Sequence, residues 1–135
     1  MTKAVWGALF AFAFAASTGA ESPAFNYALH CQGCHLEEGR GTHGSGIPPL
    51  AGSVGRFLRV PGGREYLTRV PGVTQAPLDD AALAELLSWV VRHFDAADAP
   101  DDFVTYTAEE TARGRHSPLT DVEGMRRKLL EALAK

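Results

Sequence analysis

The sequence predicts a small all-α protein. No segment alternates apolar and polar residues in the way a half-buried strand does. Instead, the segment after Asp79 repeats apolar residues at helical spacing, and two later segments begin with a Ser/Thr-x-x-Glu capping box. A chain of 135 residues, 45% of them hydrophobic, suffices for one small domain.

The first twenty residues are typical of an export signal. Lys3 provides a positive start, and residues 4–16 are apolar apart from one glycine. This run is shorter than the roughly 20 residues that span a bilayer, so a retained membrane anchor is the less favoured alternative. We expect cleavage after Ala20 and a periplasmic mature protein with no stable membrane span.

The mature chain is expected to be mildly acidic. The chain has 13 Lys and Arg and 16 Asp and Glu, and because Lys3 is the only charged residue in the signal, 12 basic residues remain after cleavage. This balance argues against nucleic acid as a partner.

The segment before residue 31 is predicted to be helical. Ser22 is a good N-cap, Pro23 suits the first helical position, and Phe25, Ala28 and Leu29 recur at helical spacing. From residue 39 to 46 the chain holds four glycines, which predict an irregular loop.

Three further helices are expected before residue 95. Two short ones cover residues 53–60 and 62–70, each ended by a Pro-Gly pair. A longer helix begins at Asp79 as N-cap, with Trp89 in the core rather than against a cofactor. Its apolar face comprises Ala82, Leu83, Leu86, Leu87, Val90, Val91 and Phe94.

The C-terminal part is predicted to be a helical extension, residues 96–135, after a main domain of residues 21–95. Residues 95–102 are typical of a linker. Capping boxes begin at Thr107 and Thr120, and the second predicted helix carries an apolar stripe. The stripe comprises Val122, Met125, Leu129 and Leu133, and the charged cluster beside it, interpreted as solvated, comprises Arg126, Arg127 and Lys128.

The sequence Cys31-Gln32-Gly33-Cys34-His35 carries the chemistry. C-x-x-C-H is the attachment signature of a c-type haem: both thiols bond to one porphyrin, and the histidine binds the iron. A zinc site would need further ligand pairs, although His30 and His43 lie nearby. A thioredoxin-like pair would follow a strand, which is not predicted here. One covalent haem therefore explains both cysteines.

Together, these features resemble the class I monohaem cytochromes c over residues 22–94. The resemblance rests on the haem motif, the glycine loop followed by Pro49-Leu50-Ala51-Gly52, and the amphipathic helix after Asp79. It implies thioethers at Cys31 and Cys34, and His35 as the proximal ligand through Nε2. It also implies that the Pro49 carbonyl accepts a hydrogen bond from His35 Nδ1.

One family feature is missing. The family places a methionine on the other face of the haem, near Val73 or Thr74, but residues 68–78 contain none. Gln75 is a weak ligand. The sixth coordination position of the iron then has three main alternatives: no side chain at all, Met125 from the tail, or His116. The less favoured candidates are His30, His43 and His93.

The leading functional hypothesis is a non-enzymatic periplasmic electron carrier. It would accept single electrons as the haem subunit or partner of an exported dehydrogenase or oxidase. The alternative is a haem module that binds small ligands such as gases at an open iron. A minor peroxidase activity would need an acid or base above the iron, which the sequence does not position. The tail is hypothesised to cover the haem face that the missing methionine loop leaves unprotected.

Overall fold

The structure, a computed structural model, describes residues 21–42 and 44–135. The expected export signal (1–20) and His43 lie outside the described residues. Within those residues the chain forms eight helices and no strand, which confirms the all-α prediction. The only extended pairing in this part of the chain is an isolated bridge between Thr42 and Ile47.

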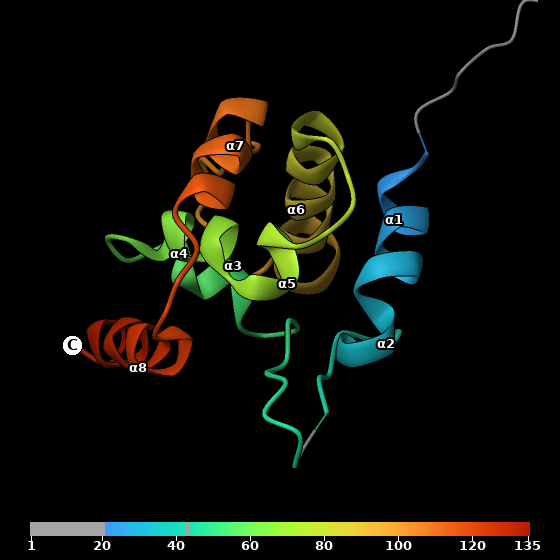
Figure 1. Cartoon of the computed structure of the whole chain (residues 1–135). Helices are drawn as coiled ribbons and strands as arrows, with labels where there is room; N and C mark the ends of the chain where they lie inside the picture. The colour runs from blue at the N-terminus through green and yellow to red at the C-terminus, as the bar shows by residue number, and fades with distance from the viewer. Residues whose placement is uncertain (1–20, 43) are drawn as a thin grey trace, which may run out of the picture.

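The helices follow one another in two groups along the chain, as Figure 1 shows. Those up to residue 95 are α1 (Pro23–His30), α2 (Gln32–His35), α3 (Val54–Phe57), α4 (Gly63–Arg69), α5 (Pro71–Thr74) and α6 (Asp80–Asp95). Those of the tail are α7 (Ala108–His116) and α8 (Val122–Leu133).

Three helices begin where the capping signals predict. The Ser22 hydroxyl accepts a hydrogen bond from the Phe25 amide at 3.2 Å, and Asp79 accepts one from the Ala82 amide at 2.7 Å. The capping box at Thr107 is complete: the Thr107 hydroxyl accepts a hydrogen bond from the Glu110 amide, and the Glu110 carboxylate accepts one from the Thr107 amide. Side chains that satisfy the first free amides of a helix explain why these starts were readable from sequence.

Two details of the predicted helices were wrong: a further helix begins at Pro71, and the last helix has a different N-cap. Pro71 ends α4 as expected but also begins α5. A proline can begin a helix because the N–H group that it lacks would have no hydrogen-bond partner in the first helical turn. The last helix is capped by Asp121 and not by Thr120: the Asp121 carboxylate accepts from the Gly124 amide at 2.8 Å. The carboxylate competes better for helix amides than the neighbouring hydroxyl.

Helix α6 is the centre of the core and lies between α1 and α7 (Figure 1). Its predicted apolar face is confirmed, with Leu83, Leu86 and Val91 almost fully buried. Trp89 packs against Tyr27 of α1, with ring centroids 5.5 Å apart. This packing fixes the direction of α1, which leads directly into the cysteine motif.

The tail packs on the same core. Helix α7 contacts α6 and α4, and Tyr106 is buried just before it. The Tyr106 amide donates to the Ser88 hydroxyl at 2.8 Å, and Arg64 of α4 pairs with Glu110 of α7. The expected linker begins later than residue 95, because Asp95 belongs to α6, is buried, and accepts from the Gly55 amide at 2.7 Å.

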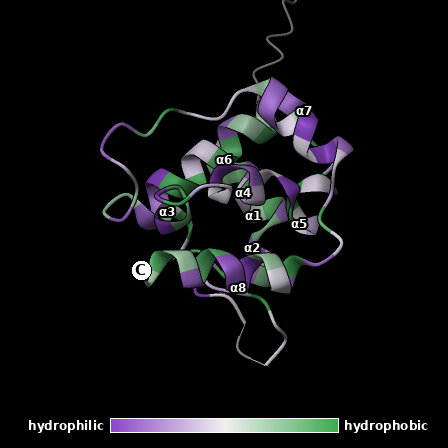
Figure 2. Cartoon of the chain, turned by 90° about the vertical axis from the view of Figure 1, so that its left-hand side faces the viewer, coloured by the Kyte–Doolittle hydropathy of each residue, from purple (hydrophilic) through white to green (hydrophobic). Residues whose placement is uncertain are grey.

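Helix α8 crosses below the core, where it contacts α3 and α4. Figure 2 shows hydrophobic and hydrophilic residues side by side along it. The predicted stripe is confirmed: Leu129 is buried, and Val122, Met125 and Leu133 are partly buried against the core. None of the helices described is long and apolar enough to cross a membrane.

Candidate functional site

The two cysteines lie on one turn of backbone at the junction of α1 and α2. The Cys31 amide donates to the Tyr27 carbonyl at 2.9 Å, so Cys31 closes α1, and the His35 amide donates to the Cys31 carbonyl at 2.9 Å. Both thiols are free; Cys34 is exposed and Cys31 is partly buried. Burial, followed by the neighbouring Cys34, raises the pKa of the Cys31 thiol to about 11. Both side chains are therefore available to bond to one ligand.

His35 is oriented by a backbone carbonyl. Its Nδ1 lies 3.1 Å from the carbonyl oxygen of Pro48. Because a carbonyl only accepts, Nδ1 carries the proton, and Nε2 of the neutral ring keeps its lone pair for a metal. Burial lowers the pKa of His35, which also favours the neutral ring, while the Pro48 hydrogen bond opposes this shift.

The prediction that Pro49 supplies this carbonyl was wrong by one residue. The loop turns back at the Thr42–Ile47 bridge, and the Gly41 amide donates to the His35 carbonyl at 3.0 Å. A Cβ at Gly41 would lie 2.7 Å from the Pro48 oxygen, so only glycine lets this carbonyl come so close. Pro49 is exposed and lies one position further along the chain.

These residues fit a covalent porphyrin. Two free thiols three positions apart and an imidazole with Nε2 available form the donor set that a c-type haem requires. Among the described residues, no three His, Cys, Asp or Glu side chains come together to hold a metal ion by themselves.

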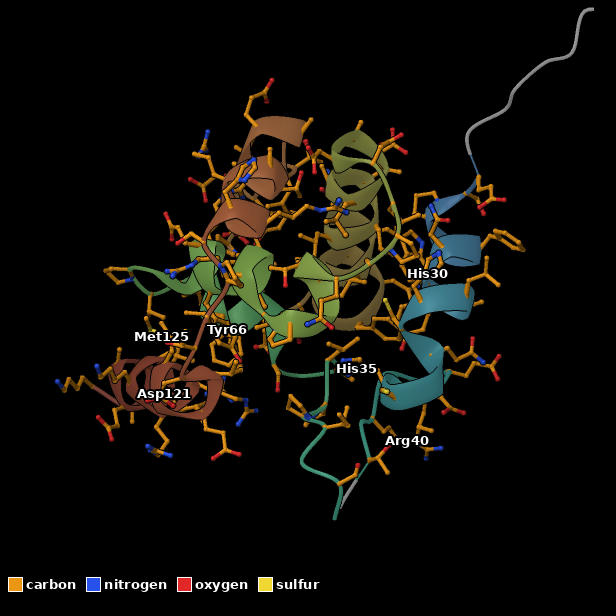
Figure 3. All side chains as sticks on the ribbon, viewed as in Figure 1. His30, His35, Arg40, Tyr66, Asp121 and Met125 are labelled. Atoms are coloured by element: carbon orange, nitrogen blue, oxygen red, sulfur yellow. The ribbon has the colours of Figure 1, made fainter. Side chains whose placement is uncertain are left out.

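The two favoured candidates for the sixth iron position both lie on helices of the tail. Met125 lies on α8, where it packs against the hydrophobic core, well apart from His35 (Figure 3). His116 is the last residue of α7, is exposed, and belongs to a helix that packs on α4 and α6. Met125 therefore has the environment of a packing side chain, as its place in the apolar stripe indicates.

Most of the other residues considered for this position are occupied otherwise or exposed. Val73 packs against the core, Thr74 donates to a backbone carbonyl within α5, and Gln75 is exposed. His30 ends α1, and His93 is exposed on α6. His43 is outside the described residues.

Sequence reasoning missed one partly buried cation. Arg126 was interpreted as solvated, yet its Nε is buried and has no hydrogen-bond partner in the described part of the chain. It lies four residues after Val122 and three before Leu129, so the helical stripe already includes its position. That spacing was the available signal.

Comparison with known proteins gives two relatives and no matching family model. The chain is 34% identical over 108 residues to a cytochrome c-552 of Thermus thermophilus. This match covers 67% of this chain and 82% of the relative. It is equally identical, over the same share of this chain, to a second cytochrome c-552 of the same species, of which 72% is covered.

Proposed function

The chain belongs to the class I c-type cytochromes, which are electron carriers. We therefore propose that Cys31 and Cys34 bind one haem covalently and that His35 binds its iron. The observation that carries this proposal is the pair of free thiols one turn from an imidazole whose Nδ1 is held by the Pro48 carbonyl. A bound haem supplies a one-electron Fe(III)/Fe(II) couple.

The residues around His35 limit its motion. The Pro48 carbonyl holds the ring in one tautomer and raises its basicity, as such outer partners do. The Thr42 hydroxyl donates to the Cys34 carbonyl at 2.8 Å, which ties the loop to α2. Small rearrangement between oxidation states favours fast electron exchange, so a rigid ligand turn suits a carrier.

The surface beside the cysteines suits a transient partner. Three of the five exposed large hydrophobic side chains of the described residues lie in α1 or directly after α2: Phe25, Leu29 and Leu36. Exposed apolar side chains gathered around a site are typical of protein contact surfaces. We infer that a redox partner, an exported dehydrogenase or oxidase, meets the protein here, in the periplasm, after removal of residues 1–20.

A second function has a specific observation in its favour. Residues 68–78 contain no methionine, and Met125 packs against the hydrophobic core away from His35 (Figure 3). An iron without an internal sixth ligand binds small molecules such as carbon monoxide. This favours a gas-binding or sensing module as the alternative.

Visible spectra of the ferric and ferrous holoprotein, with and without carbon monoxide, separate the two functions. A carrier with an internal ligand gives low-spin iron that does not respond to carbon monoxide. High-spin iron that binds carbon monoxide readily, together with the absence of any complex with a co-purified dehydrogenase or oxidase, favours the gas-binding module.

A further inference from the structure

The backbone turns back directly after the proposed iron ligand. Leu36 follows His35 with φ 67° and ψ 167°, a conformation that glycine adopts easily and residues with a Cβ rarely do. It is the one non-glycine residue with a positive φ in residues 21–42 and 44–135. Such a conformation is strained and persists only where other contacts hold it.

The side chain of Leu36 does not account for its conformation. Leu36 is 39% exposed, so burial of the leucine does not offset the strain. The contacts that hold it are made by its backbone. Its amide donates to the Gln32 carbonyl at 2.8 Å, and its carbonyl accepts from the Gly39 amide at 3.2 Å. The same carbonyl accepts a third hydrogen bond, from the Tyr27 hydroxyl at 2.5 Å, and this bond alone comes from outside the turn.

Tyr27 is a rigid donor. It is 3% exposed, and its ring centroid lies 5.5 Å from that of Trp89 and 4.9 Å from that of Phe94, both on α6. Burial raises the pKa of Tyr27 to about 12, so the hydroxyl keeps its proton at neutral pH. Phe94 also lies against the turn, since a Cβ at Gly39 would be 2.7 Å from its ring. The packing of α1 on α6 therefore supports the turn from the core side.

The turn at Leu36 sets the direction of the loop that meets His35. The Gly41 amide donates to the His35 carbonyl at 3.0 Å, and the Pro48 carbonyl lies 3.1 Å from Nδ1 of the ring. Both contacts need the chain to reverse between residues 35 and 41. With Leu36 at an ordinary negative φ, the chain would leave α2 in another direction, and the loop would not return to the ring.

We propose that Tyr27 is a positioning residue for His35: its hydroxyl keeps Leu36 in the strained conformation from which the loop returns to the ligand ring. This inference rests on the proposed binding of haem iron by His35. The hydrogen bond from Nδ1 to the Pro48 carbonyl makes the imidazole a stronger electron donor, and a stronger donor stabilises the ferric state. Tyr27 thereby lowers the midpoint potential of the haem through its effect on His35.

The test measures two properties of the holoprotein: the midpoint potential, and the hyperfine-shifted NMR resonances of the His35 ring in the ferric state. Tyr27→Phe keeps the aromatic ring and removes the hydroxyl, so the potential rises and the resonances move. Tyr106→Phe is the matched control, because Tyr106 is also buried and its hydroxyl donates to the Arg64 carbonyl at 3.3 Å. The control lowers the melting temperature but leaves the potential and the resonances unchanged.

Leu36→Gly tests the step through the backbone. Glycine adopts φ 67° and ψ 167° without strain, so this variant keeps the wild-type potential and has a higher melting temperature. In the double variant with Tyr27→Phe, the potential no longer rises, because the turn holds its conformation without the hydroxyl.

An unchanged potential in Tyr27→Phe, or an equal change in Tyr106→Phe, overturns the inference. A rise that persists in the double variant shows that Tyr27 does not act through Leu36, and overturns it as well. If Tyr27→Phe yields no folded holoprotein, the double variant decides: recovery with the wild-type potential supports the inference, and no recovery overturns it. A wild-type protein without covalent haem refutes the proposed function itself, and the missing colour shows this before any potential is measured.

Discussion

The clearest test of the tail's place in the fold is a pair of adjacent leucines on α8. Leu129 is 4% exposed and packs in the core, whereas Leu130 is 38% exposed. Leu→Ala removes three carbon groups; at about 0.8 kcal/mol each the transfer loss is roughly 2.4 kcal/mol when the side chain is fully buried. The enclosed site also leaves a cavity, so we expect Leu129→Ala to cost about 3 kcal/mol.

Leu130→Ala is the control, with the same chemistry one residue away. Because the side chain is not enclosed, its cost is at most roughly 1.5 kcal/mol. Both are measured by denaturant unfolding of the holoprotein and by hydrogen exchange of the α8 amides, since α8 has its main helix contacts with α3 and α4 and can open locally. Equal losses for the two variants, by both methods, would refute the docking of α8 on α3 and α4.

Three further predictions concern how the tail is held. Ser88→Ala leaves the buried Tyr106 amide without its acceptor, and we expect a loss of about 1–3 kcal/mol in the free energy of unfolding. Glu110→Gln weakens the pair with Arg64 by about 1 kcal/mol at neutral pH. The pair holds the pKa of Glu110 below its usual value, so the stability that it provides is lost as the pH falls through that lowered pKa. In thermal scans, the difference in melting temperature between variant and wild type should therefore disappear in acid. Asp121→Ala costs about 1 kcal/mol through loss of the cap, whereas alanine at the preceding threonine has no comparable effect on thermal unfolding.

Sequence patterns predicted the elements that depend on local interactions. The starts of α1, α6 and α7 follow from side chains that bind amides within three residues, and the buried face of α6 follows from its helical spacing. Such interactions need no knowledge of the rest of the fold. The cysteine motif is equally local, because its chemistry lies within five consecutive residues.

The features that were missed depend on contacts between distant segments. The carbonyl that meets His35 is that of Pro48 because Gly41 brings Ile47 and Pro48 against the turn. The environment of Arg126 is set by α3 and α4, which lie far away in the sequence. The spacing of the apolar stripe indicated a buried position at residue 126, but Arg126 was predicted to be solvated because its side chain is charged.

The tail is another feature that the sequence described incompletely. Residues 96–135 were predicted as an extension after a linker, yet Ala99, Tyr106 and Leu129 belong to the same hydrophobic core as Leu83. A truncation after Pro100 would therefore remove core side chains along with any cover over the haem. Single substitutions in α8 are the better test of that cover.

The most direct test of the account is the mass of the peptide that spans Cys31 to His35, from protein matured in an exporting host that attaches haem. We predict one haem bound through two thioethers, retained after denaturation and acid extraction into organic solvent. Colour that passes into the solvent, or a peptide with two unmodified cysteines, would contradict the covalent haem on which the proposed function depends.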